Sequence, residues 1–469
     1  MFLPRISSEI LGGQCYGYAR LIAVPKIVSA AMRGNADGED GCKALAVAKK
    51  IHESGSAGMK RFDSIYRGIV WMAAGFLVTT SGCKKSGSAG GDPSATATQV
   101  WPEVGTQKII VLKRSRTGDG SHPEFLSATL APGRGMNVLQ ITAWLPGKGE
   151  VPLLATPPIA DAAKALNADA PDGPGNTSFS MGGAILFPFA NRLTGTLSAN
   201  KQTEAVTWQD NTVQVPANWH GKNPDAKVLA MHGMLLNSRA DVVDLNALSD
   251  SASAKVTYHW KANGRWFSNN DVVVEATLDA DSFTLMVQAI NTGGDSEPVG
   301  IGWHPYFQLP SGNRANARLY VPALARALTN NSDDVLPTGK LAKVQGTSYD
   351  FSVDGGAPLP PGQLVDDAFV QLMRNADGGA TCQLEDTAAD YGIRVEAISP
   401  RIRAFQVYSP PTSSFVAIEP QFNYADPFGS EWSGEDTGMV TVEPGRDVVW
   451  KTRLEIFQPS QANTAPAAQ

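Results

Sequence analysis

The sequence is poor in cysteine, in long apolar runs and in clustered positive charge. Four cysteines occur in 469 residues. There is no CxxC pair and no HExxH motif, so the usual zinc-ligand patterns are missing. Glycine-rich phosphate loops and serine-centred elbows are missing as well. The net charge is -6 without a Lys/Arg stripe, which argues against nucleic-acid binding. We therefore expect no metal, no cofactor and no nucleic-acid partner.

Residues 1–58 show no strong hydrophobic period and do not read as the start of a domain. From Met59 the chain carries basic residues and then an apolar run, 69–78, that is too short to span a bilayer as a helix. Small residues then lead to Cys83, and this order of features is typical of a secretory signal. The last four residues of the signal resemble a bacterial lipobox, with Thr80 where leucine is usual.

We therefore expect residues 59–83 to be a lipoprotein-type signal peptide with Cys83 lipidated, and residues 1–58 to be an upstream extension absent from the mature protein. The alternatives are an ordinary signal peptide or a short core helix. Lipidation would make the protein an exported, periplasmic or cell-envelope lipoprotein of a bacterium, touching the membrane only through that anchor. Cys382 would then be the remaining free cysteine, which leaves no disulfide framework.

The rest of the chain reads as one β-rich domain. Residues 84–103 are polar and predicted to be a flexible linker, residues 104–458 are predicted to form the domain, and the tail 459–469 is expected to be disordered. Within the domain, short runs rich in Val, Ile, Thr and aromatic residues are separated by Gly, Pro, Asn and Asp. Helical periodicity is scarce: residues 157–168 are the best candidate, and 240–249 are ambiguous.

Many strands without alternating helices imply an all-β fold, an antiparallel sandwich or barrel, and not a parallel sheet. The chain has no fixed-period repeat of the propeller kind. A neutral or small polar ligand suits the charge balance of such a domain.

One stretch stands out, residues 300–309, "GIGWHPYFQL". It sets His304 at the start of a strand, between apolar residues and a proline, where burial and neighbours can tune its pKa. A core histidine bonded to backbone is the alternative. With the turn before it, "NTGGDSEPVGIGWHPYFQL" resembles the aldose 1-epimerase (galactose mutarotase) family.

Further segments are similar to that family, in the family's order, from about Val104 to Phe457. "AILFPFANRLTG" matches its Asn-Arg segment, and "MHGMLLNSRADVV" matches its first histidine segment, with methionines where Leu and Gly are common. "LVDDAFVQL" and "FQVYSPPTSSFVAIEPQF" match its aspartate and glutamate segments. The positions so matched are Asn191, Arg192, His232, Asp366 and Glu419, with Asp367 as the alternative to Asp366.

The resemblance implies a large antiparallel β-supersandwich and an enzyme that interconverts the α and β anomers of a free aldose such as galactose or glucose. It implies that Glu419 is the catalytic base and His304 the catalytic acid, one on each side of the sugar. Asn191, Arg192, His232 and Asp366 would bind the sugar. No metal or cofactor is implied, and the oligomeric state is open.

The chemistry needs these residue types. Anomers exchange when the ring hemiacetal opens and recloses on its other face, so one group takes a proton from the C1 hydroxyl while another gives one to the ring oxygen. A carboxylate and an imidazole can do both, and a nearby carboxylate would favour the charged form of His304. Trp219 could stack on a sugar face.

Each position also has a structural alternative. Glu419 could belong to a structural ion pair, Arg192 to an ordinary salt bridge, and His232 and Asn191 could shape turns. Two other functions remain open: a non-catalytic carbohydrate-binding lipoprotein of the same fold, or an epimerase for another sugar or a sugar phosphate. A phosphate would want a further cationic pocket.

Overall fold

The computed structural model describes residues 101–170, 173–221, 226–247, 251–330 and 335–462. The predicted upstream extension, the signal segment with Cys83 and most of the predicted linker lie outside the described residues, so they stay predictions.

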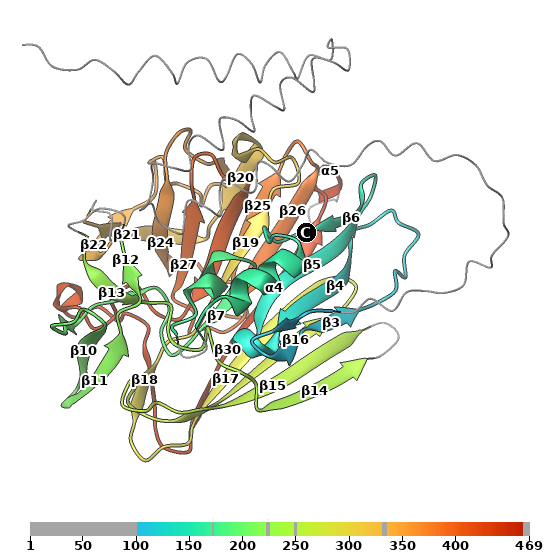
Figure 1. Cartoon of the computed structure of the whole chain (residues 1–469). Coiled ribbons are helices and arrows are strands. Elements are labelled where there is room, and N and C mark those ends of the chain that lie inside the picture. The colour runs from blue at the N-terminus through green and yellow to red at the C-terminus, as the bar shows by residue number, and fades with distance from the viewer. Residues whose placement is uncertain (1–100, 171–172, 222–225, 248–250, 331–334, 463–469) are drawn as a thin grey trace, which may run out of the picture. The chain divides into compact units, whose positions relative to one another are not determined.

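Two large antiparallel sheets make up the described domain (Figure 1). The first has eleven strands: β3 (Ile110–Lys113), β4 (Glu124–Ala131), β5 (Asn137–Leu145), β6 (Gly149–Pro152), β7 (Gly183–Leu186), β19 (Gly302–Gln308), β21 (Ala323–Thr329), β22 (Pro337–Lys343), β24 (Val365–Leu372), β27 (Ala404–Ser409) and β28 (Phe415–Gln421). Its order is β22-β21-β24-β27-β28-β19-β7-β5-β4-β3, with β6 beside β5.

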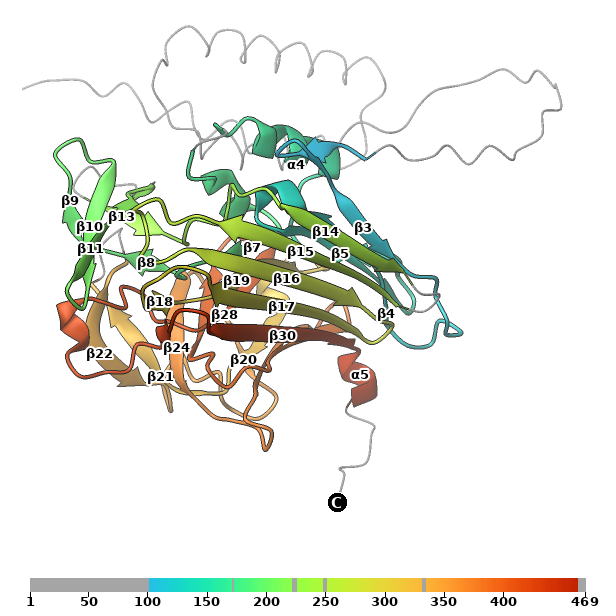
Figure 2. The same cartoon turned by 90° about the horizontal axis from the view of Figure 1, so that it is seen from below.

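The second sheet has nine strands in the order β14-β15-β16-β17-β30-β26-β25-β20-β23. Figure 2 shows the first five of them side by side. The bounds are β14 (Val242–Ala247), β15 (Ala252–Trp260), β16 (Asn270–Leu278), β17 (Ser282–Asn291), β20 (Ala317–Tyr320), β23 (Ala357–Pro358), β25 (Ala380–Asp386), β26 (Tyr391–Ala397) and β30 (Asp447–Phe457).

Small sheets and short helices complete the fold. The remaining strands are β1 (Glu103–Val104), β2 (Gln107–Lys108), β8 (Arg192–Leu193), β9 (Thr196–Leu197), β10 (Thr203–Trp208), β11 (Asn211–Pro216), β12 (Trp219–His220), β13 (Val228–Met231), β18 (Glu297–Val299) and β29 (Val440–Val442). The helices are α4 (Ile159–Asn167), α5 (Pro459–Ala462) and the 3-10 turns Pro132–Arg134, Asn176–Ser180, Arg314–Asn316 and Ser430–Trp432.

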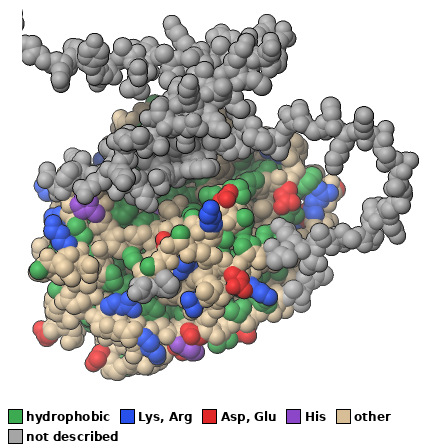
Figure 3. Space-filling view, viewed as in Figure 1, with side chains coloured by type: hydrophobic (Ala, Val, Ile, Leu, Met, Phe, Trp, Pro, Cys, Tyr) green, Lys and Arg blue, Asp and Glu red, His purple; other side chains and the backbone are tan. Residues whose placement is uncertain are grey.

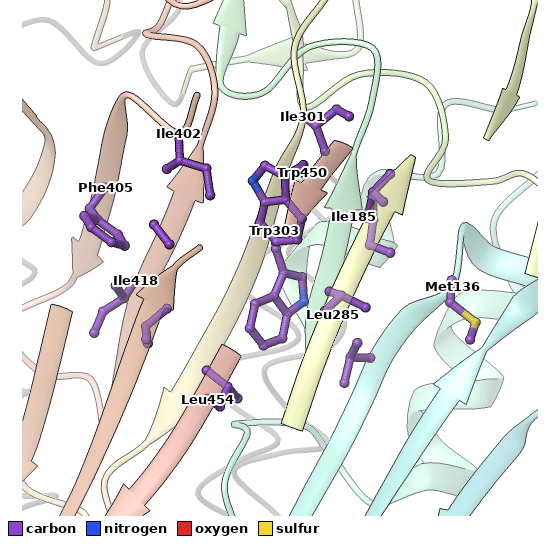
Figure 4. Packing of buried hydrophobic residues seen from close by; sticks show 14 of the residues in the cluster. Met136, Ile185, Leu285, Ile301, Trp303, Ile402, Phe405, Ile418, Trp450 and Leu454 are labelled. Atoms are coloured by element: carbon purple, nitrogen blue, oxygen red, sulfur yellow. The ribbon is translucent and has the colours of Figure 1, made fainter. Parts of the chain in front are cut away.

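The core lies between the two large sheets. In β17, buried and half-buried residues alternate along the whole strand, as expected when one face of a sheet packs and the other meets solvent. Phe283 of β17 and Trp303 of β19 meet with ring centroids 6.3 Å apart. Trp450 and Leu285 belong to the same buried cluster (Figure 4). Burial of each such side chain stabilises the fold by roughly 1.5–3 kcal/mol, and the predicted all-β antiparallel fold is confirmed.

The two local predictions for 157–168 and 240–249 meet different outcomes. Helix α4 spans Ile159–Asn167, inside the predicted range, and buries Ala162, Ala163 and Leu166. The ambiguous segment forms the edge strand β14, paired with β15. None of the helices in the described ranges is long and apolar enough to cross a membrane.

Ordered segments extend slightly beyond both ends of the predicted domain, 104–458. The fold begins before residue 104, because Trp101 packs against a buried cluster and β1 starts at Glu103. It continues past residue 458, since Ser460 of helix α5 donates to Asp390 through its backbone N–H, at 2.9 Å, and through its hydroxyl. Tertiary contacts order these short segments, which their composition alone does not reveal.

Candidate active site

Three neighbouring strands place one polar row on the eleven-stranded sheet. Gln406 of β27 is the register partner of Glu419 of β28. The next pairing joins Gly302 to Gln421 and Tyr306 to Ala417, so His304 of β19 comes level with Glu419. Alternate residues of a strand face opposite sides. Because Trp303 packs in the core between the sheets, His304 and Glu419 point away from it.

His304 and Glu419 are in direct contact. Nε2 of His304 lies 3.2 Å from Oε1 of Glu419, with side chains 7% and 2% exposed. The other carboxylate oxygen, Oε2, accepts a hydrogen bond from Nε2 of Gln421 at 2.8 Å. This contact leaves no space for a sugar between the two groups as they lie here.

Burial sets the protonation of this pair. It lowers the pKa of His304 to about 4, with the charge of Arg192 as a smaller cause. It also raises the pKa of Glu419 well above its usual value, helped by the negative charge of Asp366. Loss of hydration acts against the effect expected of a nearby carboxylate, which would favour the charged form of His304. Burial thus favours the uncharged form of both groups.

Four further side chains close a ring of hydrogen bonds beside the pair. Arg192 donates from Nη1 to Oδ1 of Asn191 at 3.0 Å and from Nη2 to Oδ2 of Asp366 at 3.2 Å. Gln406 donates to Oδ1 of Asp366 at 2.6 Å and accepts from Nδ2 of Asn191 at 3.0 Å. Each member is held by two others, so the polar atoms are fixed in place before any ligand arrives.

The neighbouring Asp367 lies on the other face of β24. It forms an ion pair with Arg326, with 2.5 Å between Oδ1 and Nη1, and Arg326 lies over the ring of Tyr349. The alternative assignment of the site aspartate to Asp367 is therefore wrong, because a shift of one residue turns a side chain to the opposite face.

His232 completes the cluster from a loop. Its ring meets that of His304 edge-on, with centroids 5.0 Å apart, and Phe179 packs at 5.0 Å as well. Burial lowers the pKa of His232 well below its usual value, with the charges of His304 and Arg192 adding to the effect. Burial thus favours the neutral form of His232, and its Nδ1 is buried without a hydrogen-bond partner in the described structure.

Asn191 and His232 both have left-handed backbones, with φ of 62° each. For a residue other than glycine this conformation costs about 1–3 kcal/mol and persists only where the surroundings impose it. The two residues are joined directly, since the backbone N–H of His232 donates to the carbonyl oxygen of Asn191 at 2.9 Å.

The segment 187–194 connects the parts of the site. The carbonyl of Phe187 accepts from the backbone N–H of Met234 at 2.6 Å, and that of Pro188 accepts from Gly300 at 2.7 Å. The carbonyl of Arg192 accepts from Asp426 at 2.6 Å. Hydrogen bonds therefore join this segment to the His232 loop, to the residues before His304 and to the loop after Glu419.

The structure brings together all six residues that the resemblance singled out: Asn191, Arg192, His232, His304, Asp366 and Glu419. It adds Gln406 and Gln421, which the sequence reading missed. A weak signal for both exists, because each is a polar residue at an alternating position of an otherwise apolar strand, and each is at most 5% exposed. Alternation alone does not show which residue lies opposite in the next strand.

Trp219 is half-buried and packs on Phe179, the ring that contacts His232, with the Trp219 and Phe179 ring centroids 6.0 Å apart. Its contacts give it packing partners next to the site. Within the described ranges, no group of three or more His, Cys, Asp or Glu side chains is arranged to hold a metal ion.

Known proteins resemble this chain in sequence and in fold. The sequence model of the family described as aldose 1-epimerase matches residues 163–455. A curated relative, the uncharacterized protein YphB of Escherichia coli (strain K12), is 25% identical over 185 residues, which are 38% of this chain and 57% of that protein. The match thus spans little more than half of the relative's length.

Two solved structures share the fold. A galactose mutarotase-like protein from Clostridium acetobutylicum has a TM-score of 0.57 and 17% identity, covering 75% of this chain and 99% of the other. An aldose epimerase homologue from C. elegans has a TM-score of 0.53 and 14% identity, covering 75% and 98%. The fold is therefore galactose mutarotase-like, and because the family match covers more than half of the sequence, the chain belongs to the aldose 1-epimerase family.

Proposed function

We propose that this protein is an aldose 1-epimerase that interconverts the α and β anomers of a free aldose, with galactose and glucose as the first candidates. The observation that carries the proposal is the buried contact between His304 and Glu419, 3.2 Å apart. An acid and a base that share one proton at a dry, polar-lined position are what anomer exchange requires.

The reaction conserves protons. Ring opening breaks the O1–H and C1–O5 bonds, forms the C1=O1 double bond and adds a proton to O5. Rotation about the C1–C2 bond and reclosure reverse these changes on the other face of C1. Since O1 and O5 are both bonded to C1, two groups on one side of the sugar can serve both oxygens.

By its family position Glu419 is the base at O1 and His304 the acid at O5, which requires the shared proton to be on His304 during the reaction. Burial in the empty site favours the neutral form, with the proton on Glu419. We propose that the sugar moves it. An O1–H that donates to Glu419 stabilises the carboxylate, because hydrogen bonds to the charged form lower a carboxyl pKa.

The ring of Arg192, Asp366, Asn191 and Gln406 would orient the sugar through its hydroxyl groups. The guanidinium supplies a rigid set of donors and the Asp366 carboxylate supplies acceptors, so together they complement hydroxyls that both donate and accept. His232, neutral and with one unpartnered nitrogen, would bind a further sugar oxygen.

The charge of this ring favours a neutral sugar over a sugar phosphate. Arg192 is paired with Asp366 at 3.2 Å, so its positive charge is already compensated. A phosphate would have to compete with that carboxylate for the guanidinium. The part of the site that the structure describes therefore suits an uncharged aldose.

We also propose that the protein is exported and lipid-anchored through Cys83, on the support of the sequence of residues 59–83. Mass spectrometry of the N-terminus of the native protein tests this proposal. Diacylglyceryl-modified Cys83 as the first residue is expected, and a native protein that retains residues 1–58 would overturn it.

Polarimetry tests the enzymatic proposal. Freshly dissolved α-D-glucose and α-D-galactose should lose their excess rotation faster with the protein than without it, and Glu419→Gln and His304→Ala should each remove the acceleration. His259→Ala, an exposed histidine on β15, and Glu275→Gln, on β16, are matched controls that should keep it. No acceleration by folded protein with either sugar would contradict the proposal for these two sugars and would leave the two other functions, an epimerase for another sugar or sugar binding without catalysis.

A further inference from the structure

Two asparagines far from each other in the chain make the same contact. Nδ2 of Asn423 donates to the carbonyl oxygen of Ala190 at 2.9 Å, while the backbone N–H of Ala190 donates to Oδ1 at 3.0 Å. Nδ2 of Asn218 donates to the carbonyl oxygen of Met231 at 3.1 Å, while the backbone N–H of Met231 donates to Oδ1 at 2.8 Å. Each side-chain amide thus forms hydrogen bonds with both the backbone N–H and the backbone carbonyl of one residue.

In both cases the residue bound by the asparagine side chain comes directly before a residue of the site. Ala190 comes before Asn191 and Met231 comes before His232, and these are the two site residues with a left-handed backbone. Such a backbone is sparsely populated for residues other than glycine and is held by its surroundings. A side-chain amide that holds both the N–H and the carbonyl of the preceding residue limits the backbone conformations open to the site residue that follows.

Each asparagine is itself anchored to another part of the site. Asn423 is fully buried and lies four residues after Glu419. A Cβ added to Gly300, four residues before His304, would lie 2.1 Å from Oδ1 of Asn423. The Asn423 amide therefore fills the space between the segments that carry the catalytic pair and the segment that carries Arg192.

Asn218 is anchored on the side of His232. Its Nδ2 also donates to Oδ1 of Asn176 at 2.8 Å. Asn176 begins the 3-10 turn that contains Phe179, the ring that packs on His232. The end of strand β13, before His232, and the turn that carries Phe179 are therefore joined through one amide.

We propose that Asn423 and Asn218 are positioning residues, which hold Asn191–Arg192 and His232 in the geometry that binds the sugar. This rests on the proposed function of the site. Neither amide belongs to the hydrogen-bond ring of Arg192, and neither is needed for proton transfer. Their loss should weaken substrate binding more than it slows the chemical step, because a misplaced binding group costs affinity and orientation.

The test uses Asn423→Asp and Asn218→Asp in the full-length protein. Both changes keep size and shape but replace the donor NH2 with an oxygen that faces a carbonyl oxygen. The matched control is Asn167→Asp at the end of helix α4. The Asn167 side chain also forms two hydrogen bonds with backbone: it donates to the Glu103 carbonyl and accepts from the Gly105 N–H, at 2.8 Å each. It touches no residue of the site.

Four quantities are measured: KM and kcat for anomerisation, the 15N resonances of the His232 imidazole, and the melting temperature. We expect KM to rise roughly tenfold in both site variants, with a smaller change in kcat. The His232 resonances should move in Asn218→Asp. Asn167→Asp should change the melting temperature alone.

Wild-type KM and His232 resonances in a folded Asn218→Asp variant would overturn the proposal. If Asn423→Asp does not fold, Asn218→Asp and the milder Asn218→Ser decide, since Asn218 is half-buried. If the wild-type protein turns over no aldose, the proposed function fails by itself, and the His232 resonances still report whether Asn218 positions that ring.

Discussion

Nε2 of His304 lies 3.2 Å from Oε1 of Glu419, and the two side chains are almost fully buried. At this distance the two groups titrate as one unit. Burial disfavours the charged form of both groups, so we expect the pair to share a single proton near neutral pH. The predictions below follow from this contact and from the polar side chains around it.

The pH dependence of kcat/KM should reflect the buried pair. Burial lowers the pKa of His304 to about 4, so a second proton joins the pair only below that pH. Activity should therefore fall on the acid side near pH 4 and not near 6.5, the ordinary histidine pKa. On the alkaline side it should fall when Glu419 loses the remaining proton. An acid limb centred near the ordinary histidine value would contradict this account.

Replacing Gln421 should shift the alkaline limb of the pH profile of kcat/KM to higher pH. Gln421 donates to Glu419 at 2.8 Å, which favours the carboxylate, so Gln421→Leu should raise the pKa of Glu419 further. A fall in kcat/KM of roughly tenfold at neutral pH should accompany the shift. The control is Gln383→Leu on β25 of the other sheet, and a limb that does not move in Gln421→Leu would count against the assignment of Glu419.

Asp366→Asn should move the same limb downward. The negative charge of Asp366 raises the pKa of Glu419, so its removal makes deprotonation easier. KM should rise as well, because the hydrogen-bond ring loses the partner of Arg192. The adjacent Asp367→Asn is the matched control, since Asp367 faces away toward Arg326. If Asp367→Asn moved the limb and Asp366→Asn did not, the facing of β24 would be contradicted.

The burial of Glu297, away from the site, predicts that the folded protein loses stability as pH rises. Its side chain is fully buried, and burial raises its pKa from 4.5 to about 8. The folded state therefore keeps a proton that the unfolded chain releases above pH 4.5, so this contribution is complete below that pH and is lost as pH rises toward 8. Glu297→Gln should remove the loss, because a glutamine stays neutral and can still accept from Asn270.

Urea unfolding at pH 4.5 and at pH 8 measures this effect. Glu297→Gln should be more stable than the parent by about 4 kcal/mol at pH 8, with little difference at pH 4.5. The matched control is Glu275→Gln, at a half-buried glutamate of β16. An equal change in stability at both values would mean that Glu297 is not protonated in the folded state.

The sequence alone was sufficient for the features that depend on local pattern. Alternating apolar residues indicated strands, and the scarcity of a helical period left one strong helix candidate, which became α4. The ordered segments also singled out the residues that the fold gathers, from Asn191 to Glu419. Local pattern is enough here, because a strand's periodicity and a motif's residue types are properties of neighbouring positions.

Only the tertiary structure decided how those residues act on one another. The register of β27, β28 and β19 brings Gln406 and His304 level with Glu419, and the pleat separates Asp366 from Asp367. Neither can be read from one strand, since register depends on the partner. The left-handed backbones of Asn191 and His232 and the burial of His304 and Glu419 likewise arise from contacts between distant segments. The protonation state of a group depends on how well water hydrates it, and this hydration is known only from the folded structure.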